Sequence, residues 1–166
     1  KVTTPKGTGI SPSAYKILPK ITAIAPTTAV AENAEITLTG TNLTAPKEVK
    51  VNTKVATFTP VSATEVKAKI PVGATTGTVQ LTTDDGTATS TATVTILPPP
   101  TIASFTPTMA KVGDVVTITG TALDGATEVK IGGVVATIDS KTATEIMAKV
   151  GASAADGTVL VTTPGG

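Results

Sequence analysis

Apolar and polar residues alternate along several short stretches of this chain, which are residues 35–39, 48–52, 64–70, 77–82 and 92–96. A period of two places successive side chains on opposite faces of a β-strand. Turn-forming residues separate the stretches: Gly40 with Asn42, Pro46, Pro71 with Gly73, and Asp84 to Gly86. No stretch has a helical period. Short alternating strands at this spacing predict an all-β chain built of β-sandwiches.

The pattern occurs twice. Gly40–Thr83 aligns without gaps on Gly120–Thr163, with matched landmarks such as Leu-Thr-Gly-Thr at 38–41 and Ile-Thr-Gly-Thr at 118–121. A repeat of this length is one structural unit of a tandem array. We therefore expect a complete repeat at residues 20–98 and a second repeat at 99–166, which lacks a counterpart of the strand at 91–97.

The N-terminal residues resemble the end of such a repeat. Val2–Gly7 matches Leu81–Gly86, and Ala14–Pro19 matches Thr93–Pro98. Residues 1–19 are thus predicted to be the terminal strand segment of a preceding repeat, or a donor strand. Because the chain begins at Lys1 and not at Met, we expect a mature product or an excised fragment.

Two explanations of residues 8–18 remain. They continue a longer array, or they complete the second repeat of a neighbouring identical subunit by strand addition, which builds a head-to-tail polymer. The duplicated turn at Val2–Gly7 favours the longer array. In both cases residues 8–18 should lie extended and apart from the sheets of residues 20–98, and the strand within Gly157–Thr163 should have an open edge.

Prolines occupy both junctions, at Leu18-Pro19-Lys20 and Leu97-Pro98-Pro99-Pro100. Proline fixes φ and favours an extended, stiff spacer. The repeats should therefore stand end to end as an extended rod.

Composition narrows the chemistry. The chain is rich in Thr, Val and Ala, has no Cys or His, and draws all 13 of its basic residues from Lys against 12 acidic residues. It therefore lacks imidazole, thiolate and guanidinium groups. We expect no catalytic residues, no metal site and no cofactor. The net charge of +1 argues against nucleic-acid binding, and no apolar run is long enough to span a bilayer.

The motifs resemble those of the IPT/TIG domain, an immunoglobulin-like fold. The second repeat carries them at Ile102, Phe105, Pro107, Ile118–Leu123, Val129–Thr137, Thr142–Ile146 and Gly157–Gly166. The first repeat departs from the pattern in two turns, at Asn52-Thr53-Lys54 and Asp84-Asp85-Gly86. These departures affect loop geometry and not the fold.

This resemblance implies three settings: bacterial or archaeal surface and secreted proteins, receptor ectodomains, and DNA-binding transcription factors. The absence of Cys and Arg favours the first. We therefore expect an extracellular or cell-surface protein, and a non-catalytic structural repeat of a stalk, adhesin or filament. The alternatives are a polysaccharide- or protein-binding module, or accessory domains of a secreted polysaccharide-degrading enzyme.

Four groups of residues are candidate sites. Asp84 and Asp85 could bind Ca²⁺, but a polar hairpin turn is the simpler interpretation. Glu48, Glu65, Glu128 and Glu145 could form acid/base pairs, yet their recurrence in both repeats favours solvated strand faces beside Lys50, Lys67 and Lys130.

The remaining two groups concern glycans. Asn42 begins an Asn-x-Thr sequon, which is a glycosylation acceptor, and since Ala122 takes its place in the second repeat, the sequon is not a structural feature of the repeat; O-glycans on Thr are a further option. Tyr15, Phe58 and Phe105 could stack on sugars, but their matches to Val94, Ile138 and Ile24 predict core positions.

Overall fold

The computed structural model describes residues 1–12 and 14–166, so residue 13 of the segment 8–18 lies outside the described residues. The described residues form β-strands, turns and irregular segments, with no helix, which confirms the all-β prediction. No helix that is long and apolar enough to cross a membrane occurs in this part of the chain.

The first sandwich is made of two four-stranded antiparallel sheets. One sheet has the order β3 (Lys20–Ala25), β4 (Glu35–Thr41), β8 (Glu65–Lys69) and β7 (Phe58–Ser62). The other has the order β10 (Gly86–Val94), β9 (Gly77–Thr83), β5 (Glu48–Val51) and β6 (Lys54–Ala56). Ile36, Leu38, Val66, Val49 and Leu81 are among the buried residues between the sheets, as the alternating pattern requires.

The second sandwich repeats this arrangement with one strand fewer. Its larger sheet has the order β11 (Thr101–Thr106), β12 (Val115–Thr121), β16 (Glu145–Lys149) and β15 (Thr137–Lys141). Its other sheet has three strands, β14 (Val134–Val135), β13 (Glu128–Ile131) and β17 (Val159–Thr162). The counterpart of β10 is absent from the described residues, and β17 therefore lies at an edge.

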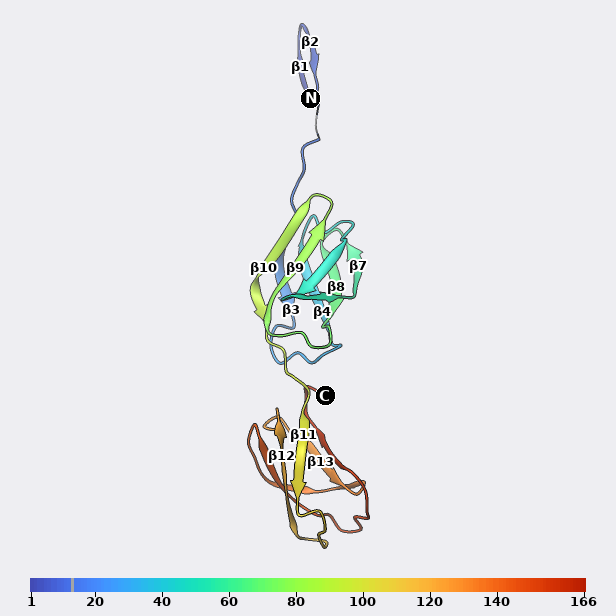
Figure 1. Cartoon of the computed structure of the whole chain (residues 1–166). Coiled ribbons are helices and arrows are strands. Elements are labelled where there is room, and N and C mark those ends of the chain that lie inside the picture. Colours follow the sequence, from blue (N-terminus) through green and yellow to red (C-terminus); the bar gives the residue numbers. More distant parts are fainter. Residues whose placement is uncertain (13) are drawn as a thin grey trace.

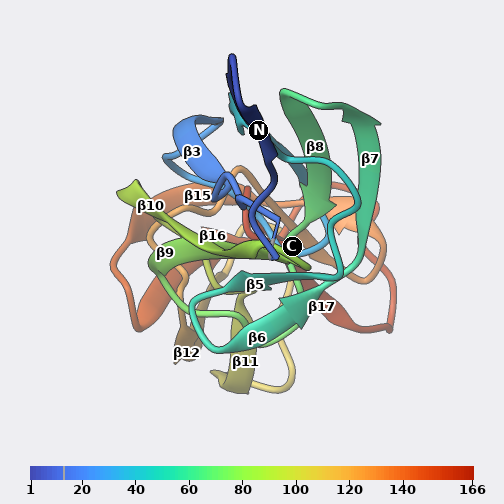
Figure 2. The same ribbon diagram turned by 90° about the horizontal axis from the view of Figure 1, so that it is seen from above.

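The N-terminal residues form a hairpin of their own, β1 (Val2–Thr4) and β2 (Gly7–Gly9), which pairs with no other strand among the described residues. The hairpin, the first sandwich and the second sandwich follow one another along a single long axis (Figure 1), and the view along that axis superimposes the two sandwiches (Figure 2). The C-terminus lies at the junction between the sandwiches (Figure 1).

Gly40 was expected to help end a strand, and this expectation is wrong. Gly40 lies inside β4, opposite Ile21, where β3 has an irregular register. A Cβ atom at Gly40 would overlap the carbonyl oxygen of Lys20. The second sandwich has the same arrangement, with Gly120 against Thr101. The repeated Thr-Gly-Thr motif therefore permits close approach of two strands and does not mark a turn.

The strand expected at residues 92–96 is also different. β10 begins at Gly86, has an irregular register between Thr89 and Thr93, and ends at Val94. Ile96 then forms a separate parallel bridge with Val30. The alternation at 92–96 thus reflects the burial of Val94 and Ile96 on one side. Between these two residues the backbone changes its pairing partner from β9 to Val30.

Candidate functional site

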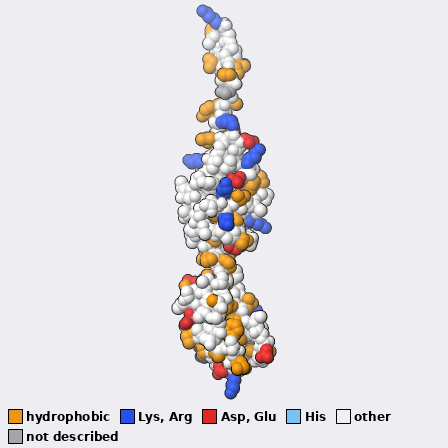
Figure 3. All heavy atoms as spheres, viewed as in Figure 1, with side chains coloured by type: hydrophobic (Ala, Val, Ile, Leu, Met, Phe, Trp, Pro, Cys, Tyr) orange, Lys and Arg blue, Asp and Glu red, His pale blue; other side chains and the backbone are white. Residues whose placement is uncertain are grey.

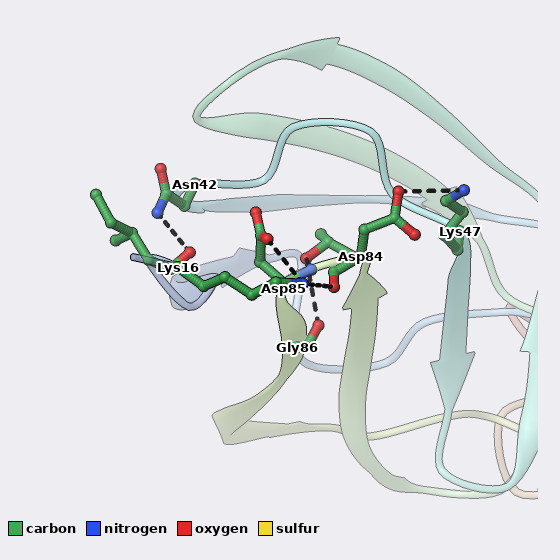
Figure 4. A network of polar contacts seen from close by, with 8 residues as sticks. Lys16, Asn42, Lys47, Asp84, Asp85 and Gly86 are labelled. Atoms are coloured by element: carbon green, nitrogen blue, oxygen red, sulfur yellow. Dashed lines mark hydrogen bonds and ion pairs between the residues drawn. The ribbon is translucent and has the colours of Figure 1, made fainter. Parts of the chain in front are cut away.

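The loop end of the first sandwich holds the N-terminal segment through polar contacts (Figure 4). Lys16 Nζ donates a hydrogen bond to the Asp84 carbonyl oxygen at 2.8 Å and lies 3.4 Å from Asp85 Oδ1. Asn42 Nδ2 donates to the Ile17 carbonyl oxygen at 2.8 Å. The loop after β4 and the β9–β10 turn therefore bind the segment that leads into β3 through hydrogen bonds and an ion pair.

The β9–β10 turn is one of three turns in the described residues that share the same hydrogen bonds. In the β9–β10 turn, the Thr83 hydroxyl donates to the Gly86 carbonyl oxygen at 3.3 Å and accepts from the Asp85 amide at 3.2 Å. Thr4 makes the equivalent bonds in the N-terminal hairpin, and Thr163 makes them at the C-terminus. A Thr followed by a polar turn and a Gly encodes this structure locally.

The junction between the two sandwiches resembles the junction of the N-terminal segment with the first sandwich, but different contacts form it. A shallow hollow lies at this junction, between Leu97 and Pro98 of the linker and residues of the second sandwich, which are Thr121, Ala122, Asp124, Gly125, Thr163, Pro164 and Gly165. A Cβ atom at Gly165 would overlap the Pro98 carbonyl oxygen and lie 3.0 Å from its carbon. Van der Waals fit thus replaces the polar contacts of Lys16 and Asn42.

Asp84 and Asp85 do not converge on a common point. Asp84 Oδ2 lies 3.3 Å from Lys47 Nζ, while Asp85 pairs with Lys16 on the other side of the turn (Figure 4). Among the described residues no three acidic side chains come together as metal ligands would. Both carboxylates hold lysines of adjacent segments.

The glutamates lie beside lysines on solvated strand faces. Glu48 pairs with Lys50 at 2.7 Å, and the equivalent Glu128 pairs with Lys130 at 2.9 Å. Residues two apart on a strand share a face, which explains both pairs. Glu65 and Glu145 pair across strands with Thr39 and Thr119, in matching registers of the two sandwiches.

Lys67 of β8 forms an ion pair with Glu35 of the neighbouring strand β4. Its Nζ donates to Glu35 Oε1 at 2.9 Å, and this hydrogen bond together with the charge of Glu35 raises the pKa of Lys67. The ammonium group is therefore charged at neutral pH and offers neither a base nor a nucleophile. Figure 3 shows charges of both signs interspersed along the face in view.

Phe58 and Phe105 are half-buried and pack against the two cores, as their matches to Ile138 and Ile24 predicted. The prediction for Tyr15 is wrong, because its side chain is 92% exposed. The buried Val94 that it matches packs in the first core, whereas none of the sheets that the described residues form covers Tyr15. The three aromatic residues form no common platform.

Asn42 makes a contact outside the repeat, because its side chain donates to the Ile17 carbonyl oxygen. Asn42 and its counterpart Ala122 share a φ of 56°, so the loop has the same conformation in both sandwiches. Asn tolerates this left-handed conformation better than most residues. Sequence reasoning missed its structural role because the partner of its side chain, the Ile17 carbonyl, lies in a segment that the repeat comparison left outside the first sandwich.

The family profile described as "IPT/TIG domain" matches residues 19–96 and again residues 100–166. No curated protein matches the chain.

Three similar solved structures illustrate the range. The chain is 21% identical to SGBP-B from a complex xyloglucan utilization locus in Bacteroides uniformis, with a TM-score of 0.43, over 90% of this chain and 47% of that one. It is 20% identical to the surface glycan-binding protein PbSGBP-B from Prevotella bryantii, with a TM-score of 0.43, over 87% and 39%. It is 21% identical to the full extracellular region of plexin A4, with a TM-score of 0.44, over 90% of this chain and 17% of that one. The chain spans less than half the length of each of these proteins.

Proposed function

Because the chain belongs to the IPT/TIG domain family, we propose that its two domains are a non-catalytic, stiff spacer in an extracellular or cell-surface protein. The observation that carries this proposal is the repeated junction, in which the segment entering each sandwich lies against the equivalent turn, at residues 84–86 in the first sandwich and at residues 163–166 in the second. A spacer that fixes distance and direction needs such contacts, because a free linker would let the domains swing.

The stiffness of the junction can be tested by substituting Gly165 with alanine. The added methyl group overlaps the Pro98 carbonyl, so we expect Pro98 and its neighbours in the linker to move away from the C-terminal turn while both cores stay folded. The chain has no Cys, and spin labels can therefore be placed on Cys residues introduced at the exposed Thr59 and Thr137. Electron paramagnetic resonance should give a narrow distance distribution for the parent chain and a broad one for Gly165→Ala.

The matched control for this experiment is Gly9→Ala, because a Cβ atom at Gly9 would meet nothing within 4 Å. This control should leave the distance distribution unchanged. A distribution that is already broad in the parent chain would contradict the spacer proposal.

Glycan binding is the second candidate, and it is the alternative that the names of the similar proteins favour, since two of the three are described by their xyloglucan locus or their glycan binding. No name among them mentions a stalk, an adhesin or a filament. In this chain the feature that fits a sugar site best is Tyr15, an exposed aromatic ring next to Lys16 and close to the Asn42 loop.

Calorimetric titration with a xyloglucan oligosaccharide separates the two candidates. If the domains act as a spacer, the chain gives no heat of binding. If they bind glycan at Tyr15, saturable binding is observed and Tyr15→Ala abolishes it. Val2→Ala, which truncates another exposed apolar side chain of the N-terminal segment, is the matched control and should leave binding intact.

A further inference from the structure

The two junctions of the chain use equivalent positions that carry different side chains. At the first junction, the loop end of the first sandwich meets the segment before β3 through charged and amide groups (Figure 4). The residues of this network are Lys16, Asn42, Lys47, Asp84 and Asp85. Their counterparts in the repeat alignment, in the same order, are Thr95, Ala122, Thr127, Pro164 and Gly165. All four charged residues of the network thus have uncharged counterparts at the second junction.

The difference is confined to side chains, because the backbone of the two loop ends is the same. The Lys47 amide donates to the Thr82 carbonyl oxygen at 2.8 Å, and the amide of its counterpart Thr127 donates to the Thr162 carbonyl oxygen at 2.9 Å. The turns at residues 83–86 and 163–166 also share their hydrogen bonds. The five residues therefore change what the loop end binds and leave its shape as it is.

Lys16 is the centre of the first junction. Its ammonium group donates to the Asp84 carbonyl oxygen at 2.8 Å and lies 3.4 Å from Asp85 Oδ1. The carboxylate of Asp84 pairs instead with Lys47, at 3.3 Å. Asp84 and Asp85 keep 72% and 48% of their side chains exposed, so dissolved ions reach both pairs. Salt therefore weakens this junction, since the Debye length falls from about 10 Å at 0.1 M to about 3 Å at 1 M.

The second junction is held by close packing. A Cβ atom at Gly165 would overlap the Pro98 carbonyl oxygen, and one at Gly166 would lie 3.1 Å from the Pro99 Cβ. Residues 95–100 of the linker include no ionisable side chain. Van der Waals contacts between neutral groups are not screened by ions, so salt should leave this junction unchanged.

We infer, within the spacer function proposed above, that the loop end of the first sandwich recognises a linker with a lysine at position 16 through its charge. The first junction then loosens as salt rises, while the second keeps its geometry. A linker with threonine in place of Lys16, as at position 95, would leave Asp85 without an ion-pair partner. The spacer therefore has one salt-sensitive joint followed by one salt-insensitive joint.

Spin labels on introduced Cys residues measure each junction separately. A pair at Tyr15→Cys and Thr59→Cys spans the first junction, and both of these side chains are exposed. The pair at Thr59 and Thr137 spans the second. The distance distribution across the first junction should be narrow at low salt and broad at about 1 M NaCl, where charges are screened beyond about 3 Å. The distribution across the second should have the same width at both concentrations.

Substitutions of Lys16 identify the group responsible. Lys16→Thr should broaden the distribution across the first junction already at low salt, and Lys16→Arg, which keeps the charge, should leave it narrow. Lys20→Thr is the matched control, because Lys20 belongs to the same segment but takes part in none of the ion pairs of the described residues. This control should leave the low-salt distribution unchanged.

Two results would overturn the inference and leave the spacer function standing. One is a first-junction distribution with the same width at both salt concentrations, and the other is a distribution that Lys16→Thr does not alter. Equal broadening of both junctions by salt would also overturn it, because salt would then act without the charges of Lys16 and Asp85. Failure of the spacer function has a different signature, which is a broad second-junction distribution already at low salt.

Discussion

Substituting Gly120 with alanine is expected to destabilise the second sandwich strongly while the stability of the first is unchanged. A Cβ atom at this position would overlap the Thr101 carbonyl oxygen and lie 2.9 Å from its carbon and 3.2 Å from the Ile102 Cα. All three atoms belong to the backbone of the neighbouring strand and cannot rotate away. Overpacking typically costs about 1–3 kcal/mol, and we expect the upper end or more here.

The result should be specific to the domain. Gly40→Ala creates the same clash with the Lys20 carbonyl and should destabilise the first sandwich but not the second. Urea titration followed by resolved amide resonances reports each sandwich separately. Gly125→Ala is the matched control in the second sandwich, because its Cβ would come no closer than 3.4 Å to Pro164 Cδ. Equal midpoints for Gly120→Ala and Gly125→Ala would show that the strands can separate without cost.

These glycines also show how far sequence reasoning reaches. The repeat, the all-β class and most inward-facing residues follow from alternation, because burial on one face of a strand leaves a period-two signal. The function of Gly40 does not follow, since a glycine between polar residues has the same appearance in a turn and inside a strand. Only the structure distinguishes a turn from a strand here, because it shows the Lys20 carbonyl in contact with Gly40.

Two other features depend on partners that local sequence does not reveal. β7 contains Pro60 and lacks clear alternation, yet it forms the edge of its sheet, where the missing amide of proline is tolerated. Tyr15 occupies a core position by its alignment with Val94, but its exposure depends on which sheets surround it. Repeats therefore predict which residues correspond, and tertiary contacts decide what each one does.

Extending the chain after Gly166 by the sequence of residues 87–97 is expected to stabilise the second sandwich substantially. Gly166 ends a turn with the same hydrogen bonds as the turn at Gly86, so the added residues start in the position and direction of β10. They would pair with the open edge of β17 and place the counterparts of Val94 and Ile96 over the second core, as those two residues pack in the first core. Unfolding in urea should shift to a higher midpoint for this sandwich alone.

The size of the effect can be measured within the added strand. Replacing the Ile equivalent to Ile96 by alanine should cost about 2–5 kcal/mol, as for a well-buried side chain. Hydrogen exchange at the amides of β17 (Val159–Thr162) should slow in the extended chain and recover part of its speed in this variant.

A second extension with one residue inserted after Gly166 gives the sharpest control. Because the side-chain period of a strand is two, a slip of one residue turns every apolar side chain to the opposite face. The shifted extension has the same composition apart from that residue, but it presents Thr to the second core and Val and Ile to water. If both extensions raised the midpoint equally, nonspecific association of the added residues would explain the gain, and the edge of β17 would not select the register of the added strand.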